Sequence, residues 1–207
     1  MKKEKLPKVP NQKETWNRIA EEWHQHKQIP SMAVKEFLKE SKGKILDLGS
    51  GSGRNLRKIK DGEMYLVDFS KEMIKLAKEK AEQQNIKAEF KVSDIKKLSY
   101  KDDFFNAAIC ISALHNIKGE KNRIKSIQEL YRVLKPKAKA YIGAWNIKSK
   151  RFKNKRPERL IGWTDKGKRY YYLHTEEEIH NHFKEAGFKI VEIKNSELMI
   201  NFIVQKV

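Results

Sequence analysis

The chain has 207 residues and a formal net charge of +19, and its length is enough for one domain with a substantial core. Its single cysteine, Cys110, excludes an internal disulfide and favours a reducing compartment, so we expect a cytoplasmic protein. The charged N-terminus, and apolar runs that all fall short of the roughly 20 residues of a membrane span, predict neither a signal peptide nor a membrane partner.

The first part of the chain predicts a flexible arm followed by helices. Residues 1–13 are polar and basic, and we expect a mobile arm there, outside a single domain at residues 14–207. Between Glu14 and Glu40, apolar residues recur at helical spacing on both sides of Pro30. N-terminal helices therefore precede the body of the domain.

The body of the chain alternates strand and helix patterns. Strands are predicted at KILDLGS, EMYLVDFS, AEFKVSD, NAAICISAL and KAYIGAW, with helices at Lys71–Gln84 and Arg123–Leu134. A helix at Glu176–Ala186 precedes two strands, FKIVEIK and NFIVQKV, whose short connection makes them antiparallel. The pattern predicts an α/β fold: a doubly wound, Rossmann-like and mostly parallel seven-stranded sheet with one antiparallel strand near the edge.

A glycine-rich loop, KILDLGSGSGRN, follows the first predicted strand. It contains Gly49, Gly51 and Gly53, but Arg54 stands where the dinucleotide fingerprint needs its third glycine. The Gly-Lys-Ser/Thr ending of a Walker loop is also missing from this stretch. The loop therefore favours a ligand other than a nucleotide phosphate.

Three acidic residues stand at the same edge of the predicted sheet as the loop. Asp47, Asp68 and Asp94 each lie at the carboxyl end of a predicted parallel strand. Open α/β sheets bind their ligands at this edge. Carboxylates disfavour a pyrophosphate and suit a ribose, an adenine amine and a cation, so we expect S-adenosylmethionine, with NAD as the second choice. Helix capping would explain any one of these residues, but hardly all of them. The expected cofactor site comprises Asp47, Gly49, Ser50, Gly51, Gly53, Asn55, Asp68, Phe69, Ser70, Asp94, Ile95 and Ile111.

Four stretches resemble, in order, the cofactor motifs of class I methyltransferases. They are ILDLGSGSGRN, VDFSKEMIKLAKEKA, VSDIKKL and VLKPKAKAYIGAW, between Lys44 and Trp145. One departure is that Lys137 and Ala138 replace the two glycines of the usual Leu-Lys-Pro-Gly-Gly turn, so the chain must reverse there without glycine.

Three further stretches resemble one subfamily, the tRNA wobble-uridine carboxyl methyltransferases, which includes the methyltransferase domain of a human AlkB homologue. They are WNRIAEEW, ISALHNIKGEKNRIKSIQELYRVLKP and GKRYYYLHTEEEI. The resemblance implies tRNA as substrate and esterification of a carboxymethyl group at position 5 of a wobble uridine. The subfamily often has Thr-Arg and then Trp after its first aromatic helix, where this chain has His26, Lys27 and Ser31, so an ammonium replaces the expected guanidinium.

A carboxylate acceptor is already nucleophilic, so its methylation needs alignment and exclusion of water rather than a strong base. Donors and aromatic walls would hold it, and the candidates are His115, Trp145, Lys27, Arg169 and Tyr171. The alternatives are a loop-capping role for His115, a plain core role for Trp145 and a half-buried edge strand for the tyrosines. Two histidine pairs, at 24/26 and 180/182, have no further metal-ligating residue at a suitable spacing in the sequence. We therefore expect no metal site.

A basic run follows the fifth predicted strand, so it should emerge at the ligand face. Lys148–Arg159 carries eight charges, seven of them positive, which predicts a clamp on RNA phosphates. The expected RNA contacts are Lys148, Lys150, Arg151, Lys153, Lys155, Arg156 and Arg159. A solvated loop is the alternative, and a lysine-biased proteome could also explain the net charge.

The strand KAEFKV would be the outermost in a class I methyltransferase sheet, with an edge open to another chain. Its charged alternate face could equally guard against pairing. The resembling tRNA methyltransferases are activated by a small zinc-binding subunit at this edge, which implies a heterodimer. Two rival functions stay open: a small-molecule O-methyltransferase of the same fold, and a catalytically silent RNA-binding protein.

Overall fold

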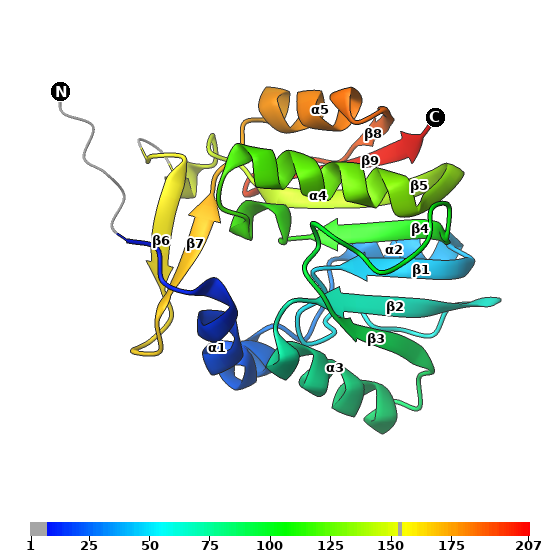
Figure 1. Cartoon of the computed structure of the whole chain (residues 1–207), viewed down its shortest axis with the longest axis horizontal. Coiled ribbons are helices and arrows are strands. Elements are labelled where there is room, and N and C mark those ends of the chain that lie inside the picture. Colours follow the sequence, from blue (N-terminus) through cyan, green and yellow to red (C-terminus); the bar gives the residue numbers. More distant parts are fainter. Residues whose placement is uncertain (1–7, 153–154) are drawn as a thin grey trace.

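A computed structural model describes residues 8–152 and 155–207 (Figure 1). Most of the expected arm, residues 1–7, and the predicted RNA contact Lys153 lie outside the described residues. Helix α1 spans Gln12–His26, two residues earlier than the expected domain boundary at residue 14. It begins there because the Asn11 side chain caps it, accepting hydrogen bonds from the backbone N–H groups of Lys13 and Glu14.

The central sheet confirms the predicted fold class. Its seven strands run in the order β3-β2-β1-β4-β5-β9-β8, and β9, next to the edge, is antiparallel to both of its neighbours. The strands are β1 (Gly43–Leu48), β2 (Gly62–Asp68), β3 (Ala88–Val92), β4 (Phe105–Ile111), β5 (Leu134–Trp145), β8 (Phe188–Ile193) and β9 (Met199–Lys206). Lys137 takes a φ of 66°, so a lysine supplies the left-handed conformation usually given to glycine in the turn.

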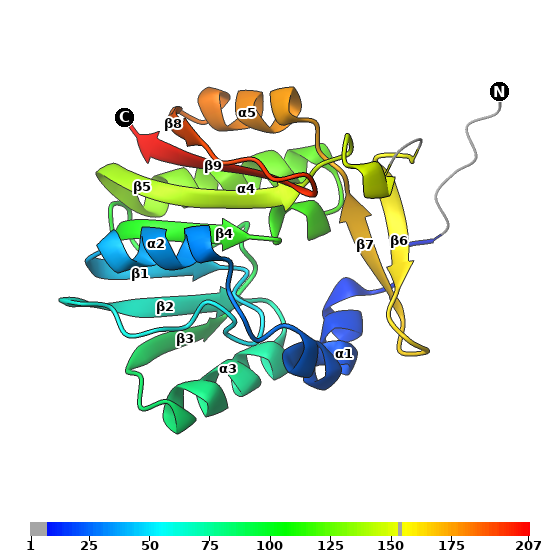
Figure 2. The same ribbon diagram turned by 180° about the vertical axis from the view of Figure 1, so that it is seen from behind.

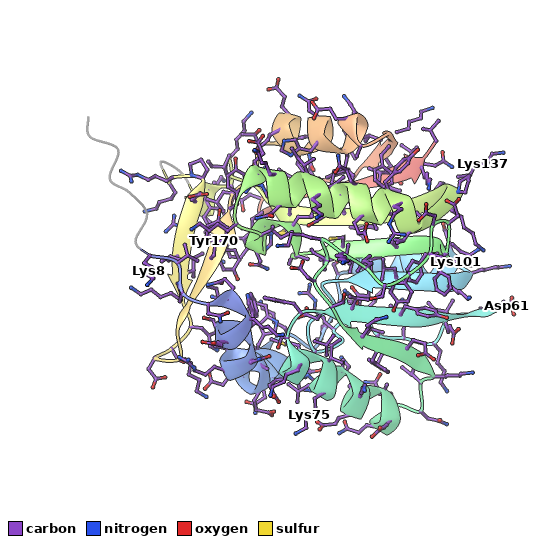
Figure 3. All side chains as sticks on the ribbon, in the orientation of Figure 1. Lys8, Asp61, Lys75, Lys101, Lys137 and Tyr170 are labelled. Carbon is purple, nitrogen blue, oxygen red and sulfur yellow. The ribbon has the colours of Figure 1, made fainter. Side chains whose placement is uncertain are left out.

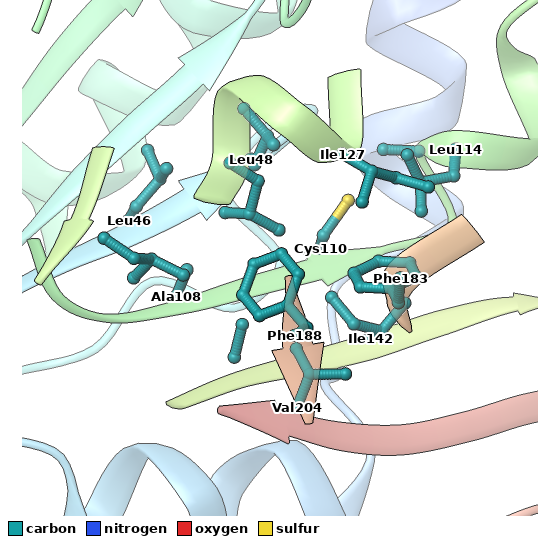
Figure 4. Packing of buried hydrophobic residues seen from close by; sticks show 14 of the residues in the cluster. Leu46, Leu48, Ala108, Cys110, Leu114, Ile127, Ile142, Phe183, Phe188 and Val204 are labelled. Atoms are coloured by element: carbon teal, nitrogen blue, oxygen red, sulfur yellow. The ribbon is translucent and has the colours of Figure 1, made fainter. Parts of the chain in front are cut away.

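Helices cover both faces of the sheet, because successive strand residues alternate between two apolar clusters. Ile45 packs with residues of α2 (Met32–Glu40) and α3 (Lys71–Gln83). Its neighbour Leu46 packs with residues of α4 (Glu120–Val133) and α5 (Glu176–Glu185). Figure 2 shows α2 in front of the sheet and α4 behind it, and Figure 4 shows the second cluster around the buried Cys110.

A second, two-stranded sheet lies across the end of the central sheet to which the parallel strands point (Figure 1). It is the hairpin β6 (Glu158–Gly162) and β7 (Lys168–Tyr172), and α1 packs between it and α3. Short 3₁₀ helices, η1 (Leu114–Asn116) and η2 (Lys150–Phe152), follow β4 and β5. The hairpin was not predicted, although an edge strand was the alternative given for the tyrosines of β7. The basic run contains η2 and the first residues of β6.

Candidate active site

The glycine loop turns sharply after β1 and leaves open space at its middle. A Cβ on Gly49 would overlap the Cβ of Ala113, so only glycine allows the loop to approach the chain after β4. Gly51 has a φ of 55°, and the nearest atom to a Cβ placed there is the Met73 Sδ at 4.0 Å. The missing side chain at Gly51 therefore leaves room for a ligand to approach the backbone.

Asp68 closes the other side of the loop. Its Oδ2 accepts from the Gly51 backbone N–H at 3.0 Å and its Oδ1 from the Ser70 N–H at 2.9 Å. Burial raises the pKa of this carboxyl to about 6, although hydrogen bonds from the backbone of Ser70, Gly51 and Phe69 lower it. Each carboxylate oxygen keeps acceptor capacity, so the group can take the hydroxyls of a ribose.

Asp47 lies behind the loop and is almost fully buried. Its Oδ2 accepts from the Asn55 Nδ2 at 3.3 Å, whereas its Oδ1 and the Asn55 Oδ1 have no hydrogen-bond partner. Burial raises the pKa of Asp47 to about 7, against the lowering effects of Asn55 and Arg54. Because buried polar atoms are normally satisfied, these orphan oxygens indicate a site completed by a bound group or by water.

A cavity of about 300 Å³ opens between the glycine loop, the chain after β4 and helix α1. Its walls include nine of the expected cofactor residues: Gly49, Ser50, Gly51, Asn55, Asp68, Phe69, Asp94, Ile95 and Ile111. The other three, Asp47, Gly53 and Ser70, support the walls from behind. Asp94 is exposed, and its Oδ2 lies 3.3 Å from the Lys96 Nζ.

The expected acceptor contacts separate into two groups. Lys27 lines the cavity, whereas His115, Trp145 and Tyr171 form a stack beside it. The Trp145 and Tyr171 rings lie 4.5 Å apart at 17°, and the His115 ring is 5.2 Å from each. His115 and Tyr171 are each only 1% exposed, and the His115 Nδ1 accepts from the Trp145 backbone N–H at 3.2 Å. Burial lowers the pKa of His115 to about 3, with further lowering by Arg169 and Arg54.

Arg169 is a buried cation whose hydrogen bonds go to neutral groups. It is 5% exposed, and it donates to the Tyr171 hydroxyl at 2.7 Å and to the Gly162 carbonyl at 3.2 Å. Its Nε has no partner. Burial lowers the pKa of the guanidinium, and the nearby Arg151 lowers it further. A desolvated cation of this kind favours a site that receives an anion.

The basic run lies beside the aromatic stack. Lys148, Lys150, Arg151, Lys155 and Arg156 are exposed, and Arg159 is half-buried in β6. The Arg151 guanidinium lies 5.4 Å from the Trp145 ring centroid, and the following Phe152 is buried against the same ring at 5.0 Å. Part of the run is therefore folded onto the aromatic stack.

Comparison with known proteins agrees with this geometry. Residues 45–137 match a family described as a methyltransferase domain. A methyltransferase from Methanosarcina mazei, described as dependent on S-adenosylmethionine, superposes with a TM-score of 0.70 and 25% identity, over 86% of this chain and 99% of that one. Residues 45–137 form a methyltransferase domain, in a chain that has the fold of S-adenosylmethionine-dependent methyltransferases.

Other similar proteins differ in what their names say they act on. The tRNA (carboxymethyluridine(34)-5-O)-methyltransferase of Arabidopsis thaliana is 36% identical over 101 residues, which are 49% of this chain and 24% of the relative. The 2-phytyl-1,4-naphtoquinone methyltransferase of Nostoc punctiforme is 38% identical over 125 residues, 57% of this chain and 53% of the relative. The methyltransferase thus spans about a quarter of the first relative and half of the second.

A Haloferax volcanii methyltransferase, solved in complex with the Trm112 methyltransferase activator, has the same fold as this methyltransferase. Its TM-score is 0.72 at 16% identity, and the match covers 95% of this chain and 96% of that one.

The residues of the methyltransferase fit S-adenosylmethionine. The open space at Gly51 and the free acceptor capacity of Asp68 suit a ligand with hydroxyl groups and positive charge, and the unpartnered oxygen of Asn55 lies on a residue of the cavity wall. Sequence reasoning missed several residues of the cavity wall: Trp16, Trp23, Arg54, Ser112, Asn116 and Lys118. Arg54 had a signal, since it replaces the third glycine of the fingerprint, but the tryptophans resemble ordinary helix core.

Within the described ranges, no group of three or more His, Cys, Asp or Glu residues is placed to hold a metal ion. Over the same ranges, every helix is too short or too polar to cross a membrane.

Proposed function

We propose that this methyltransferase esterifies the carboxymethyl group at position 5 of a wobble uridine in tRNA. The observation that carries the proposal is the gathering of cations where the cavity meets the aromatic stack. Burial lowers the pKa of the cavity-lining Lys27, and the charges of Arg54, Arg151 and Arg169 lower it further. Cations that lower one another's pKa in this way favour binding of an anionic acceptor close to the cofactor.

The acid–base properties of the stack suit a carboxylate acceptor. His115, with a pKa of about 3, is neutral near pH 7, and its Nδ1 is already occupied by the Trp145 N–H. A strong general base is not needed, because an ionised carboxylate is itself the nucleophile. S-adenosylmethionine supplies an electrophilic methyl group to that oxygen. Arg169 would hold and orient the carboxylate, and the surrounding rings would exclude water.

RNA as the carrier of the acceptor is supported by the exposed basic run beside the stack and by the name of the Arabidopsis relative. A tRNA substrate would also favour a cytoplasmic location. The second candidate, a small-molecule methyltransferase, is favoured by the similarity to the naphthoquinone methyltransferase. A buried cation would contribute little to binding of an apolar quinone acceptor. The effect of replacing Arg169 therefore discriminates between the two candidate acceptors.

Methylation of defined RNA tests the proposal. An anticodon stem-loop containing 5-carboxymethyluridine is incubated with the protein and S-adenosylmethionine, and its nucleosides are identified by mass spectrometry. We expect the methyl ester, and we expect Arg169→Gln to reduce its formation at least about 10-fold, as for loss of a buried charge contact. Absence of the ester, with and without an activator subunit, would exclude the proposal.

A partner subunit forms a second part of the proposal. In the described chain, β3 pairs with β2 alone and leaves its other edge open. Val92 on this strand is 46% exposed, whereas Phe90 and Ala88 pack partly against the core. The Haloferax methyltransferase that has the same fold was solved in complex with the Trm112 activator. We therefore propose a heterodimer in which a small activator, carrying its own zinc, continues the sheet at β3.

A further inference from the structure

Arg169 is held by aromatic rings that come from two separate elements. The guanidinium carbon lies 4.9 Å from the Trp163 ring centroid, 5.2 Å from Trp23 and 5.8 Å from Trp16. Trp23 and Trp16 belong to α1, and Trp163 belongs to the turn between β6 and β7. Aromatic faces attract a cation without neutralising it, so they can keep Arg169 charged and ready for an anion.

Of the two elements that supply these rings, the turn is the less stable. It contributes both the Trp163 ring and, through Gly162, the carbonyl that accepts from Arg169. A two-stranded hairpin has little stability of its own, so its tip needs an anchor to hold a ring in one place.

Glu22 of α1 is that anchor. Its Oε2 accepts from the Trp163 indole N–H at 2.9 Å and from the Thr164 hydroxyl at 3.4 Å. Its Oε1 lies 2.5 Å from the Lys166 Nζ. One carboxylate therefore contacts three residues of the same turn. The lysine contact also lowers the pKa of Glu22, which keeps the carboxylate charged near neutral pH.

We propose, on the basis of the acceptor role proposed for Arg169, that Glu22 is a positioning residue for carboxylate recognition. It acts through the indole N–H of Trp163, which it fixes against the Arg169 guanidinium. The Lys166 ion pair is a secondary feature, because an exposed pair of this kind contributes little. Glu22 does not itself line the cavity, so we expect its loss to weaken acceptor binding and to leave cofactor binding unchanged.

Binding of paired RNA probes tests this role. One anticodon stem-loop carries 5-carboxymethyluridine and the other its uncharged carboxamide analogue, and affinities are measured by fluorescence anisotropy with S-adenosylhomocysteine present. The protein should favour the carboxylate probe about 10-fold or more, as for one charged hydrogen-bonded contact. Glu22→Ala should lower this ratio to about 1–2, while calorimetry shows an unchanged affinity for S-adenosylhomocysteine.

Two variants isolate the indole contact. Glu22→Gln keeps an oxygen for the Trp163 N–H, and Lys166→Ala removes only the ion pair, so both should keep most of the preference for the carboxylate probe. In a double-mutant cycle, Glu22→Ala should have no further effect on the ratio once Arg169 is replaced by Gln. A full effect of Lys166→Ala, or additive effects in the cycle, would overturn the proposal.

The experiments distinguish a failure of the positioning role of Glu22 from a failure of the proposed function. If the unmodified protein shows no preference for the carboxylate probe, the acceptor assignment itself is wrong. If Arg169→Gln abolishes the preference and Glu22→Ala preserves it, only the role of Glu22 is wrong.

Discussion

The buried carboxyl of Asp47 lowers the free energy of unfolding of the protein when it ionises. Burial raises its pKa from the ordinary 3.8 to about 7, so between these pH values the folded state holds a proton that the unfolded chain has already released. Its neutral form therefore supports folding below about pH 4. That support is lost as the pH rises through 7, where the group must ionise inside the protein. A cationic ligand beside the loop would offset this cost.

Asp47→Asn should stabilise the cofactor-free protein at alkaline pH. The amide can still accept from Asn55, and it removes an ionisation cost on the order of 4 kcal/mol at pH 8. The gain in the free energy of unfolding should shrink as the pH falls from 7 towards 4. Urea unfolding at pH 8 and pH 5 measures both values, and an equal gain at the two pH values would contradict the assignment.

Single residues of the site were predictable where their chemistry depends on local sequence. Asp68 ends β2 and Gly51 lies in the loop that follows β1, so their place at the ligand edge follows from the fold class. Trp163 and Glu22 were not predictable, because their contact joins the N-terminal helix to a distant turn and no spacing in the sequence reports it.

The elements of the sheet and its helices were predicted mostly with small shifts at their ends, because their periodicity and turn residues agree. The exception is β5, which begins at Leu134, five residues before the predicted strand. The hairpin was missed for a physical reason. β6 begins within a charged run directly after Pro157, and its residues are half-buried or exposed without clear alternation. Such a strand is stabilised by pairing with β7, which in turn packs on α1, and a local pattern does not show this.

The open edge of β3 gives a prediction at the level of one element. Val92→Asp places a charge on the exposed apolar side chain of this strand, so it should weaken binding of a zinc-containing activator at least about 10-fold, measured by calorimetry. Val191→Asp is the matched control, since Val191 is 39% exposed on β8 at the opposite edge of the sheet. Equal losses in the two variants, or none in Val92→Asp, would place the activator elsewhere.

Charge at the level of the whole molecule is distributed over both ends of the sheet. The net charge of +19 includes the basic run beside the cavity and lysines at the far end, among them Lys101 and Lys137 (Figure 3). Net charge alone therefore predicts attraction to any polyanion. The proposed function requires more, namely that RNA contacts concentrate at the end that carries the cavity.

The salt dependence of tRNA binding separates these two cases. Replacing Lys148, Lys150 and Lys155 by Ala removes three exposed charges of the basic run, so the slope of log K against log salt should fall by about two to three units. The control replaces Lys101, Lys137 and Lys139, which are exposed near the amino ends of the parallel strands, and its slope should change by less than about one unit. Each variant loses the same net charge, so a purely global attraction would lower both slopes equally. An equal loss would show that the basic run is a solvated loop and not an RNA-binding site.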